Sequence, residues 1–506
     1  MKLHRPCPVK WPNVTLAFSA ITLLLGAALA AHAQEQTQNQ APARQQPERA
    51  APTFVDGEAQ IVDAFNNPDE WIREHVWVET DFDSDKNGSA DRMHVDITRP
   101  AQTATGQLKV AVIYESSPYY GGRGSGGGAM WDPHQELGAE PPPRRQPNVA
   151  RPARDTSTQI STSQVNTWVP RGFAVIHSES PGSGLSQGCP TVGGENESLA
   201  PKAVIDWLNG RACGYAAVDS QEEVFADWCT GKVGMTGTSY NGTLPLAAAT
   251  TGVDGLEAII PVSPNTSYYH YYRSNGLIRH PGGYMGEDID VLYDSINSGN
   301  LNWRAVCNEC VKVGDMYANF DRVTGDYNEF WAGRDYIHAL KPLRCAVLIA
   351  HGFNDWNVVP EHSVRIYDAL KSKNIPLMCY YHQGGHGGAP PMSLQNKFFS
   401  RFLYDVRNGI EDGPKAWIVR EDPDPPQPQG AASAGEPSQT QDQTPNRGQA
   451  GGRRSAGRRS PWSRTSWARA RARRRSWTWR SPGSDALCGL PSSQFSPRFT
   501  FTSGPR

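Results

Sequence analysis

A short segment at residues 232–243, with the sequence KVGMTGTSYNGT, constrains the fold more than any other part of the chain. Its first half contains Val233-Gly234-Met235, an apolar run typical of a buried parallel strand. The run ends in a turn where Gly237 and Gly242 flank Ser239, and an alanine-rich helical pattern follows. A strand, a sharp glycine-flanked turn and a helix, in this order, predict that Ser239 stands at the apex of a strained turn.

This turn has the layout of a nucleophile elbow. The two glycines remove the Cβ atoms that would crowd the turn, so the serine hydroxyl projects from the end of the strand. The backbone amide of the next residue, Tyr240, then points to the place where an oxyanion would form. We therefore predict that Ser239 is a nucleophile and that Tyr240 is an oxyanion donor. A glycine turn without catalytic chemistry is the alternative that the motif alone leaves open.

Two loops further along the chain follow apolar strands. Residues 345–360, CAVLIAHGFNDWNVVP, predict a strand and then a loop that contains Asp355. The strand at residues 375–381 ends in the loop HQGGHGG, which contains His386. Functional groups of open α/β sheets collect at the carboxyl ends of strands, and α/β hydrolases carry their triad in the order Ser, acid, His. We therefore predict Ser239, Asp355 and His386 as nucleophile, orienting acid and general base.

Each of these assignments has a structural alternative. Asp355 can cap the helix that is predicted from Glu361 to about residue 373. His382 competes with His386 for the role of base, but it lies at the end of a strand, where packing is expected, so His386 is preferred. A zinc site made by the two histidines needs a helix between them, and the intervening glycine pair disfavours a helix.

The motifs GTSYNG, HGFNDWNV and GGHGG resemble those of bacterial X-Pro dipeptidyl-peptidases and of the related cocaine-esterase-like and α-amino-acid ester hydrolases. The resemblance extends over about residues 55–420. It implies an α/β-hydrolase catalytic domain whose active site is covered by a helical cap insertion at about residues 271–340. It also implies that a tyrosine phenol just after an early strand faces the oxyanion. Tyr119 occupies the matching position, and Tyr120 is the alternative if the register is shifted by one residue.

The resemblance further implies a serine peptidase that releases Xaa-Pro dipeptides from free N-termini through an acyl-enzyme, without a cofactor. Its partners would be peptides with proline as the second residue. Such an enzyme needs a carboxylate in a partly dry pocket to bind the substrate ammonium. The cap segment YMGEDIDVLYD offers Glu287, Asp288 and Asp290, each of which can instead be an ordinary acid at a helix start. The alternative function is hydrolysis of esters or α-amino-acid esters with the same triad.

The N-terminus predicts export. Basic residues precede an apolar run at residues 14–30, and Ala31-His32-Ala33 is a small-x-small cleavage site. We expect a signal peptide at residues 1–33, a disordered linker at residues 34–54, and a mature protein that is secreted or periplasmic. An uncleaved anchor is the alternative. No other apolar stretch is long enough to cross a bilayer, so we expect no membrane association after signal removal.

An oxidising compartment makes the cysteines candidates for disulfides. Cys307-x-x-Cys310 fits a short disulfide, whereas a zinc site would need a second cysteine pair. A bond between Cys189 and Cys213 also fits, and the sequence does not decide between the pairings. Buried thiols are expected for two cysteines that lie in apolar strands, Cys345 and Cys379.

Residues 80–92, TDFDSDKNGSADR, resemble the first part of a calcium loop, because short oxygen-bearing side chains alternate along the segment. The bidentate glutamate of such loops is missing. A polar hairpin turn between the strands HVWVET and RMHVDI explains the same residues, so we predict no metal, with calcium as the alternative. The candidate ligands are Asp81, Asp83, Asp85, Asn87 and Asp91.

The composition changes abruptly after Arg420. No lysine, isoleucine or tyrosine follows that residue, and arginine, proline, serine, glycine and alanine dominate. The β-sandwich pattern of the relatives is missing, so we predict a disordered tail at residues 421–506, with a composition that fits out-of-frame translation of a G+C-rich gene. The net charge of −2 gives no reason to expect a nucleic-acid partner. A non-enzymatic protein that binds polyanions through this tail is the contrasting hypothesis, and it does not explain the triad.

Overall fold

The computed structural model describes residues 50–106, 108–122, 130–134, 139, 161–274, 276–282 and 284–420. The predicted signal peptide, most of the predicted linker and the tail at residues 421–506 lie outside the described residues. Within these ranges, no helix has the length and apolar character needed to cross a bilayer.

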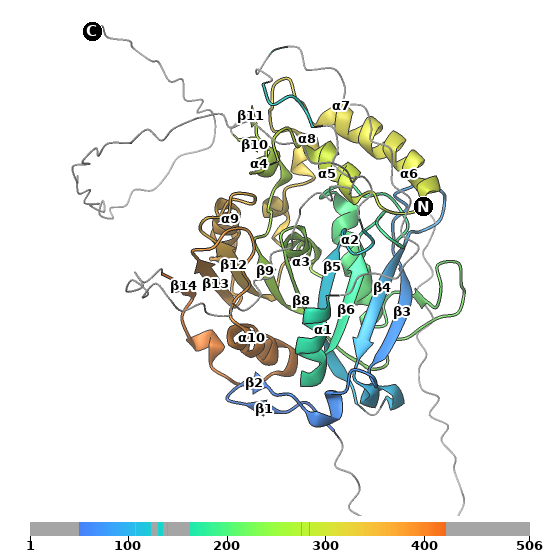
Figure 1. Cartoon of the computed structure of the whole chain (residues 1–506), viewed down its shortest axis with the longest axis vertical. Helices are drawn as coiled ribbons and strands as arrows, with labels where there is room; N and C mark the ends of the chain where they lie inside the picture. The colour runs from blue at the N-terminus through green and yellow to red at the C-terminus, as the bar shows by residue number, and fades with distance from the viewer. Residues whose placement is uncertain are drawn as a thin grey trace, which may run out of the picture. The chain divides into compact units, whose positions relative to one another are not determined.

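A mixed sheet of ten strands forms the centre of the described chain (Figure 1), in the order β14-β13-β12-β9-β8-β5-β6-β4-β3-β7. Seven neighbouring strands pair in parallel: β5 (Val110–Ser117), β6 (Ala174–Glu179), β8 (Cys229–Thr238), β9 (Leu256–Val262), β12 (Ala346–Gly352), β13 (Leu377–His382) and β14 (Ala416–Ile418). Three strands extend the sheet with antiparallel pairing: β3 (Ile72–Glu79), β4 (Arg92–Arg99) and β7 (Gly214–Tyr215).

Helices cover both faces of this sheet. One face packs against α1 (Thr162–Trp168) and α10 (Met392–Tyr404), and the other against α2 (Glu195–Leu208), α3 (Tyr240–Thr250) and α9 (Glu361–Leu370). Strands buried on both sides are apolar nearly throughout, as in β5, where every residue is buried. This is the α/β-hydrolase architecture that the sequence predicts. Helix α10 ends at Tyr404, where Asp405 adopts a left-handed conformation with φ 58°.

A helical cap interrupts the alternation of strands and helices between β9 and β12. Its elements are α4 (Tyr268–Tyr272), the hairpin of β10 (Arg273–Ser274) and β11 (Leu277–Ile278), α5 (Ile289–Ile296), α6 (Leu301–Cys307), the π-helix η4 (Asn308–Met316), α7 (Tyr317–Asn319), α8 (Glu329–Ala332) and η5 (Tyr336–Ala339). Short peripheral elements complete the described chain: β1 (Phe54–Val55), β2 (Glu58–Ala59), η1 (Asp63–Phe65), η2 (Ala101–Thr105), η3 (Val169–Arg171) and η6 (Ile410–Asp412).

One disulfide ties the loop after β6 to the end of α6 in the cap. It joins Cys189 to Cys307, which are 118 residues apart in the chain. Neither pairing considered from the sequence forms, since Cys310 is a free thiol and Cys189 bonds to the cap. Only the approach of the cap to the sheet brings these two residues together. The thiols of Cys345 and Cys379 are free and buried, as predicted.

Candidate active site

Ser239 occupies a strained turn between β8 and α3. Its backbone has φ 64° and ψ −123°, a conformation held by the hydrogen bond from its N–H to the Val262 carbonyl at 2.9 Å. Both flanking glycines are required by close backbone contacts. A Cβ on Gly237 would lie 2.5 Å from the Asn241 carbonyl oxygen, and one on Gly242 would lie 2.3 Å from the Val262 oxygen. The turn is therefore the elbow that the sequence predicts, with Ser239 at its apex.

Asp355 lies in the loop after β12 and is buried, with 4% of its surface exposed. Its Oδ1 accepts the backbone N–H groups of Asn357 at 2.9 Å and Val358 at 3.0 Å. Its Oδ2 lies 2.8 Å from Nδ1 of His386. Burial by itself would raise the pKa of Asp355, but hydrogen bonds from His351 and His386 hold that pKa well below its ordinary value. Asp355 is therefore an ionised group that orients the His386 ring.

The loop that carries His386 lies against the end of β8. The N–H of Gly387 donates to Ser263 Oγ at 3.2 Å, and a Cβ on Gly387 would lie 3.5 Å from Cγ2 of Thr238, the residue before the elbow serine. Within the described part of the chain, Ser239 and His386 share no hydrogen bond. Such contacts are often long without substrate and tighten in the reacting complex. The fold thus brings the three predicted triad residues to one edge of the sheet.

His382, the alternative base, is held by the backbone of its own loop. Its Nδ1 accepts the N–H of Gly384 at 3.0 Å, and its Nε2 lies 2.9 Å from the Gly387 carbonyl. Both ring nitrogens of His382 therefore contact backbone atoms of this loop. These contacts favour His386 as the base.

His351, at the end of β12, is a residue that the sequence did not single out. Its Nε2 lies 2.7 Å from the Val358 carbonyl and 3.2 Å from Oδ2 of Asp355, and its Nδ1 lies 2.5 Å from Ser363 Oγ. Asp355 therefore faces two imidazoles, of which the His351 ring is fully buried. The only sequence signal was a histidine four residues before the acid on the same strand end.

The amide proposed for the oxyanion belongs to Tyr240, the first residue of α3. The phenol of Tyr240 donates to Oε2 of the buried Glu197 at 2.5 Å. Glu197 also accepts the N–H groups of Val192 at 2.9 Å and Gly193 at 3.0 Å. Burial raises the pKa of Glu197, and these donors oppose the rise. Glu197 thus anchors the start of α3 to α2, a contact that no motif in the sequence signals.

Tyr119, two residues after the end of β5, packs edge-on against the ring of Tyr240, with ring centroids 6.0 Å apart. Tyr120 instead packs edge-on against His177 at 5.1 Å, and burial raises its pKa. Of the two tyrosines considered from the sequence, Tyr119 is therefore the one beside the elbow.

Two of the three candidate ammonium-binding acids are engaged within the cap. Asp288 is buried and forms ion pairs with Arg273 at 3.1 Å and with Arg322. Its pKa is lowered because these arginines outweigh the effect of burial. Asp290 accepts the phenol O–H of Tyr317 in α7 at 3.2 Å and the Trp131 indole N–H at 3.0 Å. Both carboxylates therefore hold cap elements together.

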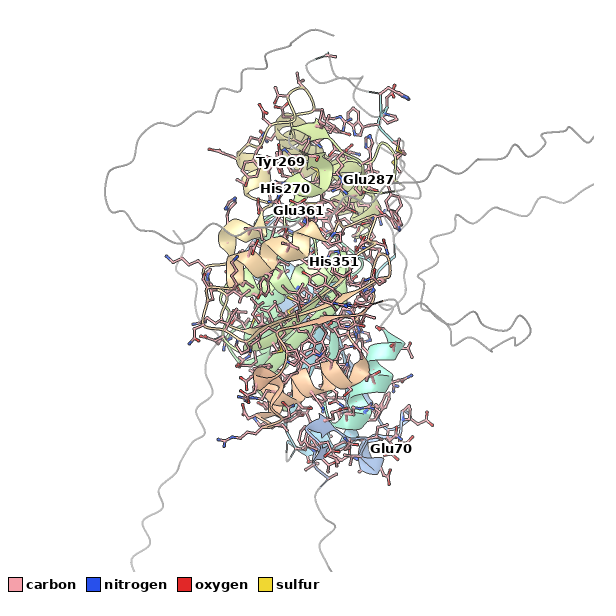
Figure 2. The ribbon with its side chains drawn as sticks, turned by 90° about the vertical axis from the view of Figure 1, so that its left-hand side faces the viewer. Glu70, Tyr269, His270, Glu287, His351 and Glu361 are labelled. Carbon is pink, nitrogen blue, oxygen red and sulfur yellow. A yellow bond between two sulfur atoms is a disulfide. The ribbon has the colours of Figure 1, made fainter. Side chains whose placement is uncertain are left out.

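Glu287 differs from its neighbours because it is partly exposed and is connected to the triad. The Tyr272 phenol donates to its Oε1 at 3.0 Å, and the adjacent Tyr271 phenol donates to Asn357 Oδ1 at 2.8 Å. The Asn357 N–H in turn donates to Asp355. Figure 2 labels Glu287 in the cap and His351 in the sheet region below it. These contacts lead from the Glu287 carboxylate in the cap to Asp355, the predicted orienting acid.

An aromatic pair adjoins Asp355. Trp356, the residue after Asp355, has 52% of its surface exposed, and its ring lies 5.9 Å from that of Tyr284. Trp356 also lies against Gly282, where a Cβ would come within 1.7 Å of the indole ring. The cap and the acid loop therefore present an accessible apolar surface beside the site.

The candidate calcium ligands lie elsewhere, in the loop between β3 and β4. One carboxylate oxygen from each of Asp83, Asp85 and Asp91 lies within 4.8 Å of the other two. Asn87 Oδ1 accepts the backbone N–H of Ser89 at 2.8 Å. Asp81 is exposed and is not part of this group.

Comparison with known proteins gives a family match over most of the described chain. The family described as X-Pro dipeptidyl-peptidase (S15 family) matches residues 87–388. A putative Xaa-Pro dipeptidyl-peptidase of Rhodopirellula baltica is 59% identical over 373 residues, which cover 73% of this chain and 59% of that protein. A putative Xaa-Pro dipeptidyl-peptidase of Bacillus anthracis is 44% identical over 357 residues, which cover 70% of this chain and 56% of that protein.

The chain therefore spans less than two thirds of the length of these curated relatives. Among solved structures, a CocE/NonD family hydrolase from Staphylococcus aureus matches with a TM-score of 0.45 and 16% identity, covering 71% of this chain and 60% of that one.

Proposed function

Because this chain belongs to the X-Pro dipeptidyl-peptidase (S15) family, we propose that it hydrolyses peptides after a proline that is second from a free N-terminus. The observation that carries the proposal is the 2.8 Å contact between His386 and the buried Asp355, on loops that meet the strained elbow of Ser239. A nucleophile, a base and an orienting acid in this arrangement support acyl transfer.

In the first half of the proposed reaction, Ser239 Oγ attacks the carbonyl carbon of the substrate proline while His386 Nε2 takes the hydroxyl proton. The imidazolium that forms is stabilised by Asp355, whose lowered pKa keeps it ionised. The tetrahedral oxyanion accepts hydrogen bonds from the Tyr240 N–H and from the Tyr119 phenol. Fixed donors of this kind stabilise the transition state because they need little reorganisation.

In the second half, His386 gives its proton to the leaving amine, and the C–N bond breaks. The dipeptide remains as an ester on Ser239. Water then attacks this ester while His386 accepts a proton from the water and returns it to Ser239 Oγ. The dipeptide leaves with a new carboxylate, and the enzyme regains its starting state.

For substrate selection, we assign Glu287 to the substrate ammonium. Asp288 and Asp290 are buried, whereas Glu287 is partly exposed and connects to the acid loop through Tyr272 and Tyr271. Trp356 and Tyr284 are suited to contact the apolar proline ring. Because Glu287 would bind the N-terminal ammonium of the substrate, cleavage would be restricted to a bond near the N-terminus, as in an exopeptidase.

Cleavage of Ala-Pro p-nitroanilide, its N-acetylated form and a simple p-nitrophenyl ester tests this proposal. We expect rapid cleavage of the free amide. An acetyl group removes the ammonium that would pair with Glu287, and loss of such a charge pair costs several kcal/mol and orders of magnitude in rate. Equal rates on the free and acetylated amides would show that Glu287 does not bind the substrate ammonium.

The second candidate function is hydrolysis of esters or α-amino-acid esters by the same triad. Partial exposure of Trp356 favours it, because an open apolar surface also accepts a small acyl group. Hydrolysis of the ester with no cleavage of either amide would support this alternative.

We also propose that the protein acts outside the cytoplasm, either secreted or in the periplasm. The Cys189–Cys307 disulfide supports this location, since such bonds persist in oxidising compartments. N-terminal sequencing of the protein isolated from culture medium and from periplasm tests the proposed cleavage after residue 33.

A further inference from the structure

The loop between β3 and β4 has the ligand spacing of a calcium loop when its positions are counted from Asp83, the first of the clustered carboxylates. Counting from Asp83, the first, third, fifth and ninth positions are Asp83, Asp85, Asn87 and Asp91. Gly88 is at the sixth position and has φ 90°, a conformation that suits the sharp turn required there. Asp81, the first residue of the run noted in the sequence, lies outside this register.

Three carboxylates converge in this loop without a cation from the described chain. One oxygen each of Asp83, Asp85 and Asp91 lies within 4.8 Å of the others. No lysine, arginine or histidine nitrogen of the described residues forms a salt bridge with any of the three. Charges this close repel one another unless something between them compensates.

Two of the carboxylate oxygens are buried and accept no hydrogen bond from the residues that the structure describes. Asp85 and Asp91 have only 3% and 1% of their surfaces exposed. Among the described residues, Asp85 Oδ2 and Asp91 Oδ1 have no hydrogen-bond donor and almost no solvent contact. A buried carboxylate oxygen without a donor is costly, and a bound cation removes that cost.

The other oxygens of these aspartates are held by hydrogen bonds. The N–H groups of Asn87 and Gly88 donate to Asp83 at 3.0 and 2.8 Å, and the Asn87 N–H also donates to Asp85 Oδ1 at 3.1 Å. Asp91 Oδ2 accepts from the Ser84 N–H and hydroxyl at 2.8 and 2.6 Å. The loop therefore positions all three carboxylates and leaves one oxygen of Asp85 and one of Asp91 for a ligand.

We propose that this loop binds one Ca²⁺ ion through Asp83, Asp85, Asn87, the backbone carbonyl of Ser89 and Asp91. Calcium fits because it takes several oxygen ligands, mostly carboxylates and carbonyls, in flexible geometry. The twelfth position is His94, whose buried ring lies 3.1 Å from Glu179 and supplies no oxygen. Water completes the shell, so we expect an affinity in the range of extracellular modules, about 10⁻⁴ to 10⁻³ M.

Calcium at this site would stabilise the loop that carries the disulfide. Ser84 Oγ, which donates to Asp91, also accepts the N–H of Cys189 at 2.8 Å. Cys189 is bonded to Cys307 in the cap. The ion would therefore stabilise the contact between the β3–β4 loop and Cys189, the residue that the disulfide links to the cap.

The test is thermal melting and calorimetric titration of the full chain with CaCl₂ after treatment with EDTA. We expect a stoichiometry of one and a melting temperature that rises by several degrees at saturation. MgCl₂ should give a smaller rise, because Mg²⁺ demands a tighter octahedral shell. Asp85→Asn should weaken Ca²⁺ binding at least ~10-fold, since it removes one ligand charge. The exposed neighbour variant Asp81→Asn is the matched control and should bind like the unaltered protein.

A structural role without calcium gives a different pattern. In EDTA, Asp85→Asn should melt no lower than the unaltered protein, because removing one of three repelling charges relieves strain. A lower melting temperature in EDTA and in CaCl₂ alike would mean that the carboxylate only holds the turn, which overturns the proposal. So would the absence of any calcium-dependent heat or shift up to about 10 mM, an order of magnitude above the expected affinity range.

Discussion

Both carboxylate oxygens of Asp355 make contacts within the candidate site. Its Oδ1 accepts two backbone N–H groups, and its Oδ2 contacts His386 and the buried His351. With this many donors, the carboxylate stays ionised despite burial. At the scale of the residue, the site therefore depends on an anion that fixes the tautomer and the orientation of His386.

Replacement of two triad residues should separate their roles. Ser239→Ala should lower kcat on Ala-Pro p-nitroanilide by about 10⁶-fold, because the nucleophile is lost. Asp355→Asn should lower it by about 10⁴-fold, because the nucleophile and the oxyanion donors remain while the imidazole takes the wrong tautomer. Circular dichroism should show an unchanged fold for Ser239→Ala. Normal turnover by that variant would contradict the assignment of the nucleophile.

A comparison of the two loop histidines should identify the base. His386→Ala should lose turnover on the scale of Ser239→Ala, since Ser and His act as a unit. His382→Ala removes two backbone contacts of the loop and should act mainly by lowering the melting temperature. Steady-state kinetics and thermal melts of both variants give the measurement. A larger loss of kcat in His382→Ala than in His386→Ala would reverse the assignment.

At the scale of the element, the elbow works because β8 and α3 meet without room for side chains at its glycines. The backbone of β9 approaches so closely that the Val262 carbonyl holds the Ser239 N–H. The strain at Ser239 is therefore maintained by the packing of a strand and a helix around it.

Gly242→Ala should test this close packing. Its new Cβ would lie 2.3 Å from the Val262 carbonyl oxygen, so the strand and the helix must separate. We expect the free energy of unfolding to fall by about 1–3 kcal/mol and turnover to fall with it. Gly333→Ala is the control, because its nearest contacts would lie at an ordinary 3.6 Å, and its stability should change by less than about 0.5 kcal/mol. Urea unfolding of both variants checks this, and equal stability would count against a tightly packed elbow.

Loss of the disulfide should weaken the connection between sheet and cap. Cys307→Ser opens a bond between residues 118 positions apart, and we expect a loss of about 2–5 kcal/mol in the free energy of unfolding. Cys310→Ser alters a free thiol three residues away and should leave stability nearly unchanged. Denaturant unfolding without reductant gives the comparison. If Cys310→Ser proves the more damaging change, the pairing is wrong.

At the scale of the whole molecule, the proposed chemistry needs two parts of the chain at once. The sheet supplies Ser239, Asp355 and His386, and the cap supplies Glu287. Tyr271 and Tyr272 of α4 connect them, since one donates to Asn357 in the acid loop and the other to Glu287. Substrate selection is therefore expected to be a property of the cap, and bond cleavage a property of the sheet edge.

Glu287→Gln should separate these two properties. Loss of a charged partner for the substrate ammonium costs about 2–4 kcal/mol, so kcat/KM on Ala-Pro p-nitroanilide should fall by about 30- to 1000-fold. Hydrolysis of a p-nitrophenyl ester, which has no ammonium, should be unchanged. Glu309→Gln, an exposed acid of the same cap, is the control. An equal loss on both substrates would place Glu287 outside ammonium recognition.

The prediction that residues 421–506 form a tail without a domain falls outside the described residues and stays a prediction. Limited proteolysis should trim the chain to a stable fragment that ends near Arg420. A protease-resistant C-terminal domain would contradict it.

The sequence by itself determined the alternation of strands and helices, the position of the cap, the glycine-flanked turn and the loops of Asp355 and His386. These features follow from local patterns, because apolar periodicity, glycine and chain order act over a few residues each. It also gave the correct burial of Cys345 and Cys379, since both lie in apolar strands.

Only the tertiary structure decided the features that join distant segments. The Cys189–Cys307 bond, the anchoring of Tyr240 by Glu197, the second imidazole on Asp355 and the packing of Tyr119 against Tyr240 all depend on which elements pack together. The same is true of the difference between Glu287 and its two neighbouring acids, because only the packed cap shows that arginines engage the buried Asp288 while Glu287 stays partly exposed. Contacts over such separations leave no periodic trace in the chain, because they are selected by the burial and charge balance of the assembled fold.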